Sequence, residues 1–155
     1  MDKHYLRMAI ELAATHSASG ENGPFGAVLV NNGKIVGTGW NRVVQSKDPT
    51  AHAEIVAIRE ACAALQSFSL EKCTLYTSCE PCPMCLSAIY WARIERIVFA
   101  GTKEDAARAG FDDAFIYREI GKACADRSLP ILHLLRNEAK AVFEAWRRNP
   151  SKRSY

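Results

Sequence analysis

The chain has 155 residues, of which 48% are hydrophobic and 24% are charged, and its formal net charge is +3. This length suits a single domain spanning residues 1–155, and the composition is that of an ordinary globular protein. The small positive charge does not by itself indicate a nucleic-acid partner. No apolar run approaches a membrane span, and Glu11 interrupts the first apolar stretch, so we expect neither a membrane protein nor a signal peptide. The six cysteines are then expected to be reduced thiols of a cytoplasmic protein.

Hydrophobic periodicity predicts helices that alternate with strands after an initial hairpin. A helical stripe near the N-terminus is formed by Leu6, Ala9, Ile10 and Ala13. Residues 26–30 and 35–40 flank Asn31-Asn32-Gly33, a good hairpin turn. There follow a helix after residue 50, a strand at 73–78, a helix from about Pro83, a strand at 96–100, a helical region at 103–121, a strand at 131–135 and a closing helix. This order predicts an α/β fold, a three-layer α/β/α sandwich whose central five-stranded mixed sheet carries helices on both faces.

The strongest chemical signal is His52-Ala53-Glu54, followed further along the chain by Pro81-Cys82-Pro83-Met84-Cys85. It supplies one imidazole and two thiolates, which Zn²⁺ binds readily, and a carboxylate that need not bind metal. Structural zinc sites use four protein ligands, whereas catalytic sites use three and leave the fourth position to water. We therefore predict one zinc ion held by His52, Cys82 and Cys85, with water or hydroxide as its fourth ligand.

Local sequence indicates how these ligands meet. Asp48 or Thr50 is the expected N-cap of a helix that carries His52 and Glu54 in its first turn. Cys82 and Cys85, three residues apart, share a face of a second helix whose positive N-terminal end favours thiolates. Zinc lowers the pKa of bound water to roughly 7, and a nearby carboxylate can move the proton between water, ring nitrogen and leaving amine. The residues thus predict hydrolytic deamination of an amidine-like carbon, with Glu54 as general acid and base.

A competing interpretation uses Cys79, which lies three residues before Cys82. With Cys79 as a fourth ligand, the site would be a closed structural Cys₃His centre and Glu54 would have no role. The other cysteines, Cys62, Cys73 and Cys124, are expected to be small core residues.

Longer stretches surround the zinc motif. They are Gly23–Ala27, Asp48–Glu54, Tyr76–Cys85, Ile89–Arg93, Ala109–Asp113 and the terminal Tyr155. A His-x-Glu sequence followed by Pro-Cys-x-x-Cys is a signature of zinc-dependent nucleobase deaminases. In these stretches the chain resembles, nearly end to end, the cytidine deaminase superfamily and within it the small bacterial guanine deaminases. The resemblance implies a cytidine-deaminase-like fold and attack of zinc hydroxide on C2 of guanine, giving xanthine and ammonia.

The resemblance also implies a set of substrate contacts. Asn41 resembles an asparagine that hydrogen-bonds the purine edge, and Phe25 lies in a segment that packs against the ring. Ala53 is also assigned to substrate binding. By its place directly after the cysteine helix, Trp91 could border the pocket, although it could equally be a packing residue. Guanine presents N1–H and 2-amino donors, which carboxylate and amide oxygens accept. By the residues alone, Asn41 could equally cap the end of a strand.

The resemblance implies two further substrate contacts in the C-terminal half of the chain, one acidic residue and one aromatic residue. Asp113 resembles a second carboxylate near the 2-amino group that shares proton transfer with Glu54, although it could equally be a solvated loop residue. Tyr155 resembles a C-terminal tyrosine that closes over the substrate, which makes residues 144–155 a candidate active-site lid. The resemblance further implies a homodimer, in which this C-terminal segment either is exchanged with the neighbour or completes its own subunit.

Three alternatives stay open. A tRNA adenosine deaminase would share the zinc motif, and its phosphate contacts could come from the basic tail Arg147, Arg148, Lys152 and Arg153, although a solvated tail is the commoner explanation. Another small-substrate deaminase could act on cytosine, guanosine or a triazine. A structural zinc module without activity is the third. Guanine is the expected partner, with no membrane and no nucleic acid.

Overall fold

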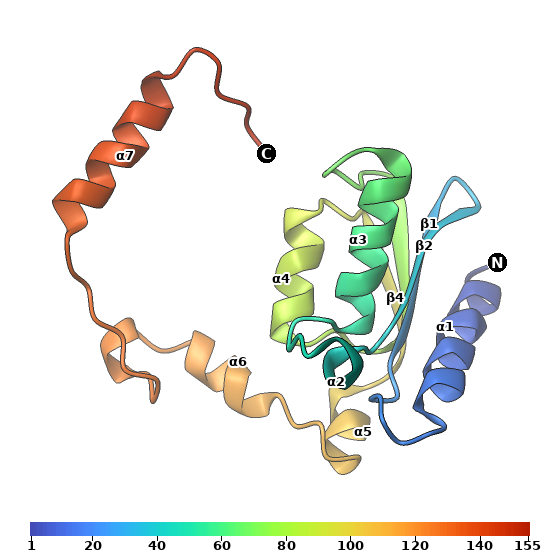
Figure 1. The fold of residues 1–155 in the computed structure, drawn as a ribbon. Coiled ribbons are helices and arrows are strands. Elements are labelled where there is room, and N and C mark those ends of the chain that lie inside the picture. The colour runs from blue at the N-terminus through green and yellow to red at the C-terminus, as the bar shows by residue number, and fades with distance from the viewer. The chain divides into compact units, whose positions relative to one another are not determined.

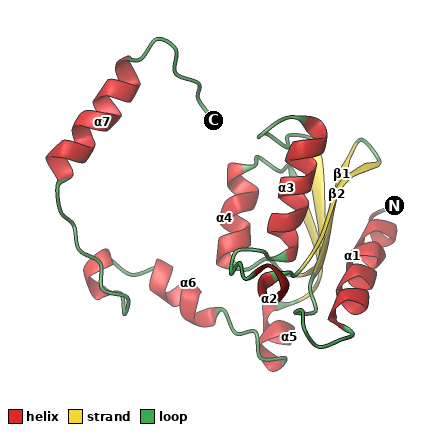
Figure 2. Ribbon diagram, in the orientation of Figure 1, coloured by secondary structure: helices red, strands yellow, loops and turns green.

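The computed structural model describes all 155 residues, which separate into two compact units, Met1–Asp113 and Ala114–Tyr155. The first unit contains α1 (Asp2–Ser17), β1 (Gly26–Asn31), β2 (Lys34–Trp40), α2 (Val43–Ser46), α3 (Ala53–Leu65), β3 (Cys73–Cys79), α4 (Pro83–Trp91), β4 (Arg96–Gly101) and α5 (Lys103–Arg108). The second contains α6 (Ala114–Ile120), a 3-10 turn (Cys124–Asp126) and α7 (Arg136–Arg148). Figures 1 and 2 show these elements as ribbons.

The first unit is built on a mixed sheet with the strand order β2-β1-β3-β4. β1 is antiparallel to both β2 and β3, whereas β3 and β4 are parallel. α1 covers one face of the sheet, and α3 and α4 cover the other (Figure 2). The predicted three-layer α/β/α arrangement with helices on both faces is therefore confirmed.

Two predicted elements differ from the structure. The predicted fifth strand at residues 131–135 is wrong, because the sheet has four strands and this segment is not a strand. It belongs to the second unit, which contains no other strand to pair with, and Leu135 adopts a left-handed conformation with φ 55° at the start of α7. The predicted helical region 103–121 is divided into α5 and α6, since Gly110 has a φ of 93° that ends the first helix.

Alternation along the strands produces a separate apolar layer on each face. On the α1 side, the buried cluster is Tyr5, Ala9, Val28, Val30 and Tyr76. On the α3 side, small residues of that helix pack on Ala27, Leu29 and Leu75, and Ile89 of α4 joins them. The zinc-motif helices therefore lie on the face of the sheet that β3 and β1 line with odd-numbered residues.

Glycines on β2 allow α3 to approach the sheet very closely. A Cβ atom on Gly39 would lie 2.1 Å from the carbonyl oxygen of Ala53, and one on Gly37 would lie 2.4 Å from that of Ala57. Neither distance is compatible with a real side chain. Gly39 thus allows the first turn of α3, where the predicted site residues lie, to rest directly on β2, and Gly37 allows the same for the turns that follow.

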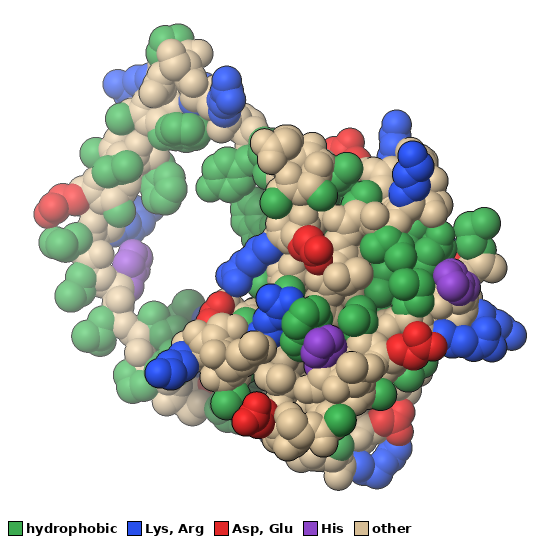
Figure 3. Space-filling model, turned by 45° about the vertical axis from the view of Figure 1, so that its right-hand side comes forward, with side chains coloured by type: hydrophobic (Ala, Val, Ile, Leu, Met, Phe, Trp, Pro, Cys, Tyr) green, Lys and Arg blue, Asp and Glu red, His purple; other side chains and the backbone are tan.

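The second unit has no buried residue of its own. Large apolar side chains of α7 remain exposed, including Val142 and Phe143, and hydrophobic groups lie on its surface (Figure 3). Cys124, expected in a core, is exposed here. None of the helices in the chain is both long enough and apolar enough to cross a bilayer. The expectation that all 155 residues serve one domain, with residues 144–155 as a lid, stays a prediction.

Candidate active site

His52 is the N-cap residue of α3, with extended backbone angles of φ −69° and ψ 158°. The predicted N-caps Asp48 and Thr50 instead form a turn before the helix, in which the Thr50 N–H donates to Asp48 Oδ1 at 2.8 Å. The His52 side chain makes no capping hydrogen bond. Its imidazole is therefore available to bind a ligand at the end of α3.

Cys82 holds the same position on the second helix. It is the N-cap residue of α4, and Pro83 follows at the first helical position, where proline's missing N–H is not needed. The Cys85 N–H donates to Cys82 Sγ at 3.5 Å. One turn of helix thus places the two sulfur atoms on one side of the N-terminus of α4.

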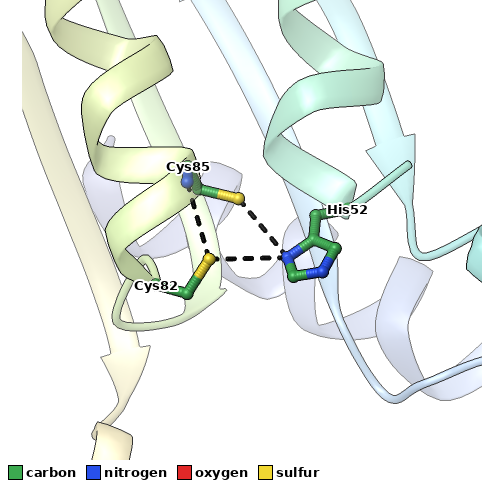
Figure 4. Close-up of side chains that lie close together, drawn as sticks. All are labelled: His52, Cys82 and Cys85. Atoms are coloured by element: carbon green, nitrogen blue, oxygen red, sulfur yellow. Dashed lines mark hydrogen bonds between the residues drawn. The ribbon is translucent and has the colours of Figure 1, made fainter. Parts of the chain in front are cut away.

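The three predicted ligands converge, as Figure 4 shows. His52 Nδ1 lies 3.5 Å from Cys82 Sγ and 3.5 Å from Cys85 Sγ, and the three ligand atoms lie within 4.8 Å of one another. Tetrahedral zinc with ordinary Zn–N and Zn–S bond lengths would separate nitrogen and sulfur ligands by about 3.6 Å. The distances and the donor set therefore fit Zn²⁺, and His52, Cys82 and Cys85 are positioned to hold it.

The pKa values of the three predicted ligands are shifted in different directions. The pKa of the Cys82 thiol is lowered to about 4, first because Cys85 donates a hydrogen bond to its sulfur and then because His52 does. The pKa of Cys85 is raised by the same neighbouring sulfur and by burial. The pKa of His52 is raised by its hydrogen bond to Cys82. Because zinc binds both cysteines as thiolates, binding of the metal requires both thiol protons to leave, and the lowered pKa of Cys82 favours the loss of one of them.

Glu54, two residues after the ligand His52 in the first turn of α3, lies beside the metal ligands without being one of them. Its side chain is buried, and Cys85 Sγ lies 3.5 Å from its Oε2 atom. Burial is the main reason that the pKa of Glu54 is raised. A carboxylate that takes up a proton easily and sits beside a zinc site can serve in acid–base chemistry.

Thr77 of β3 is a neighbour of Glu54 that the sequence analysis missed. Its hydroxyl lies 3.4 Å from Glu54 Oε1, and its side chain is buried. The available signal was alternation, because Thr77 shares its strand face with Cys73 and Leu75, which are core residues under α3.

Cys79 does not join the ligand cluster. Its Sγ atom donates to the carbonyl oxygen of Thr102 at 3.4 Å, and the pKa of the thiol is raised to about 11, mainly by burial. The Cys79 sulfur is not part of the cluster of ligand atoms formed by His52, Cys82 and Cys85. This geometry favours the open three-ligand site over the closed Cys₃His alternative.

The residues predicted to bind the purine edge and ring lie near one another. The Asn41 N–H donates to the carbonyl oxygen of Phe25 at 3.1 Å, and the Asn41 side chain is buried, with its Oδ1 atom accepting from the Val43 N–H at 3.2 Å. Asn41 therefore does cap the end of β2 at the start of α2 through its Oδ1 atom. The Phe25 ring packs edge-on against Phe111, with centroids 5.0 Å apart. Ala53 is fully buried at the first position of α3.

The other predicted contacts are Asp113, Trp91 and Tyr155. Asp113 ends the first unit, and its pKa is raised by partial burial and by the nearby Cys82 thiolate. Trp91 is the last residue of α4, so it lies about 13 Å along the helix axis from Cys82, and its side chain is exposed. Tyr155 belongs to the second unit. Contacts of Trp91 and Tyr155 with a substrate stay predictions.

Comparisons with known proteins agree with this geometry. Residues 1–101 match the family described as the cytidine and deoxycytidylate deaminase zinc-binding region. A guanine deaminase of Bacillus subtilis (strain 168) is 50% identical over 97% of this chain and 97% of its own. An X-ray structure of guanine deaminase from Bacillus subtilis superimposes with a TM-score of 0.95 at 49% identity, covering 99% of this chain and 98% of its own. A tRNA-specific adenosine deaminase of Buchnera aphidicola is 37% identical over 96% of this chain and 95% of its own.

Proposed function

We propose that this chain, which belongs to the cytidine and deoxycytidylate deaminase family, is a zinc-dependent guanine deaminase that converts guanine and water to xanthine and ammonia. The observation that carries the proposal is the 50% identity to a guanine deaminase over nearly the full length of both chains. That match continues beyond residue 101, where the family match ends. Among the stretches that carry the resemblance, Ala109–Asp113 and Tyr155 lie in this additional part of the chain.

Zinc is the cofactor, held by His52, Cys82 and Cys85. When bound, zinc lowers the pKa of a water ligand to roughly 7, so that hydroxide is available near neutral pH. Both cysteines must stay reduced to bind metal, and we therefore expect the enzyme to work in the cytoplasm.

Glu54 moves the protons of the reaction. Its buried carboxylate takes a proton from the attacking water and returns it to the ring nitrogen beside C2 of guanine. Glu54 then takes the proton of the new hydroxyl group on C2 and passes it to the 2-amino group, so that the C2–N bond breaks, ammonia leaves, and the C2–O bond becomes the carbonyl of xanthine. Burial raises the pKa of Glu54, which favours uptake of the proton from the attacking water.

The purine is held by Asn41, Phe25 and Asp113 together with the backbone around Ala53. Asp113 accepts from the 2-amino group, a donor that hypoxanthine lacks, so an analogue without it leaves a partly buried carboxylate unpaired. Phe25, supported by Phe111, packs against the flat face of the ring. We further propose that Trp91 borders the pocket and that Tyr155 closes it.

The working enzyme is a homodimer in which the C-terminal segment reaches the neighbouring subunit. A 42-residue unit is too small to bury a core of its own, and Ala114–Tyr155 leaves Phe143 74% exposed. An exposed apolar surface of this kind marks a site of contact with another protein chain. Light scattering after size-exclusion chromatography should give twice the chain mass, and Phe143→Asp should shift it to one chain mass.

The proposed function is tested by following the ultraviolet spectrum of guanine with zinc-loaded protein. Conversion to xanthine, with stoichiometric ammonia release, is the expected result. A panel of guanosine, cytosine, adenine and an aminotriazine tests the neighbouring substrate classes in the same assay. Turnover of another member of the panel with none of guanine would overturn the assignment.

A tRNA adenosine deaminase is the second candidate, because a protein of that name is 37% identical over 96% of this chain. Basic residues near the end of the chain could contact phosphates; they are Arg147, Arg148, Lys152 and Arg153. The higher identity to a guanine deaminase favours guanine. Affinity for tRNA that falls steeply with salt, together with inosine formation, would instead favour this second candidate.

A further inference from the structure

Only three polar or charged residues of the chain are buried, namely Asn41, Glu54 and Thr77. The first two have roles in the proposed function. Thr77 is the most deeply buried of the three, at 1% exposure, and the motifs of the family resemblance assign it nothing. A buried hydroxyl at such a place needs a structural reason.

Thr77 lies in the interior of the sheet. Its neighbours in register are Ala27 on β1 and Phe99 on β4, so its backbone belongs to the ladder on both sides. Its side chain shares the α3 face of β3 with Leu75, where the rest of the layer is apolar. Valine would fill the same volume here without placing an oxygen in the core. The hydroxyl is therefore the feature that distinguishes threonine at this position.

The hydroxyl has one side-chain partner, the carboxylate of Glu54, with Thr77 Oγ1 3.4 Å from Oε1. The other oxygen of that carboxylate, Oε2, lies on the side of Cys85. Leaving a buried hydroxyl without a partner costs roughly 1–3 kcal/mol, so this contact decides where the proton of Thr77 points. The distance exceeds the usual hydroxyl–oxygen range of about 2.5–3.0 Å. Catalytic hydrogen bonds are often long before the substrate complex forms and shorten within it.

The terminal torsion of a glutamate is broad and roughly two-fold, so a carboxylate is not oriented by its rotamer alone. A hydrogen-bond donor that is held in a β-strand on one side of the carboxylate would select one orientation of the carboxylate. In that orientation one oxygen accepts from Thr77 and the other is directed toward the metal ligands. Cys85 cannot serve as the second fixed donor once it binds metal, because cysteine binds zinc as a thiolate.

We propose that Thr77 is a positioning residue, whose hydroxyl holds the Glu54 carboxylate in the orientation required for proton transfer. This inference rests on the proposed function, since it assigns Glu54 the proton transfers of guanine hydrolysis. It predicts that Thr77 affects the chemical step and leaves zinc binding and substrate affinity unchanged.

The test compares Thr77→Val, which removes the hydroxyl and keeps the shape, with Thr77→Ser, which keeps the hydroxyl. Thr74→Val makes the same change on the opposite face of the same strand and is the matched control. We expect Thr77→Val to lower kcat for guanine about tenfold with KM and zinc content unchanged, as for the loss of one hydrogen bond to a charged group. Thr77→Ser should recover most of kcat, and Thr74→Val should behave as the wild type. Wild-type kcat in Thr77→Val would overturn the proposal, as would an equal loss in Thr77→Ser.

A second measurement does not depend on the substrate. In crystal structures of the zinc-loaded proteins, we expect Thr77 Oγ1 to keep its contact with Glu54 Oε1 in the wild type, where the two atoms lie 3.4 Å apart. The Glu54 carboxylate should rotate or split into two orientations in Thr77→Val. An unchanged carboxylate in Thr77→Val would overturn the positioning role. Absence of guanine turnover by the wild type would instead overturn the proposed function, and the carboxylate orientation would still decide the role of Thr77.

Discussion

Cys82 Sγ and His52 Nδ1 lie 3.5 Å apart, although the residues are 30 positions apart in the chain, because each residue is the N-cap of its helix. The N-termini of α3 and α4 therefore point to the same place. Each helix end contributes a partial positive charge that stabilises thiolate over thiol. The two cysteine thiolates balance the charge of a divalent ion. The two helix ends therefore provide a metal site that needs no further charged ligand.

Removal of a single ligand should therefore empty the site. We expect His52→Ala and Cys82→Ala each to reduce the zinc content, measured by mass spectrometry of the metal, to less than about a tenth of one ion per chain, because two ligands rarely retain zinc against dialysis. Cys79→Ser is the control. It removes a thiol that donates to the carbonyl oxygen of Thr102 and should keep both zinc and turnover. Loss of zinc in Cys79→Ser would restore the closed structural site as the better explanation.

Exchange of Glu54 for glutamine should separate metal binding from catalysis. The amide has nearly the same shape and lies outside the ligand cluster, so we expect full zinc content and an unchanged fold. An amide cannot carry the proton, and kcat should fall by about 10²–10⁴-fold. Circular dichroism and zinc analysis, measured on the samples used for kinetics, complete the comparison. Normal turnover by Glu54→Gln would remove this carboxylate from the mechanism.

Asp113 should contribute to the recognition of guanine. Its carboxylate is partly buried near Cys82, and Asp113→Asn would replace an acceptor of the 2-amino group by a group that can also present a donor. We expect kcat/KM for guanine to fall by about 10–100-fold, in line with the loss of a charged hydrogen bond. Asp112→Asn, the same change at the neighbouring residue, should have little effect. Equal effects of the two variants would indicate loss of loop charge rather than a specific contact.

The metal ligands and the order of the layers could be predicted because both depend on short stretches of the sequence. His52, Cys82 and Cys85 belong to short motifs whose spacing follows from helix geometry, and the order of strands and helices along the chain predicted helices on both faces of the sheet. The helix start was misjudged. Asp48 and Thr50 are good N-caps by residue type, yet they are used in a turn, and the metal ligand itself begins α3.

The remaining differences arise from contacts between distant parts of the chain. Residues 131–135 have a strand-like sequence, but a strand requires a partner, and local sequence does not specify one. Thr77 was overlooked because its significance comes from facing Glu54, which lies 23 positions away in the chain. The close approach of α3 to β2 is likewise visible only once Gly39 is seen against Ala53.

Gly39→Ala should test whether that close approach positions the site. Its new methyl group would lie 2.1 Å from the Ala53 carbonyl oxygen, so α3 would have to move away from the sheet. We expect a loss of about 2–3 kcal/mol in the free energy of unfolding, measured in urea, with weaker zinc retention because His52 begins the same helix. Gly121→Ala is the control, since its nearest neighbour would be at an ordinary 3.6 Å. It should change stability by less than about 0.5 kcal/mol.

Asp2 links the start of α1 to the sheet, and its contribution should depend on pH. Its carboxylate accepts from Arg96 at 2.8 and 2.9 Å and from the Tyr76 hydroxyl at 2.7 Å. Arg96, and then Tyr76, hold the pKa of Asp2 well below its usual range in the folded protein. A carboxyl group whose pKa is lower when folded stabilises the protein above its unfolded pKa of about 3.9, and this contribution is lost as the pH falls.

Asp2→Asn should therefore unfold at a lower urea concentration than the wild type at pH 7. The difference between the two proteins should begin to shrink as the pH falls below about 5 and should continue to shrink down to the lowest pH at which both are folded. The ion pair is half exposed, so the difference should also decrease in high salt. Asp126→Asn makes the same charge change at an exposed residue of the second unit and should leave the urea midpoint nearly constant. A gap between the wild type and Asp2→Asn that widened in acid would contradict the lowered pKa.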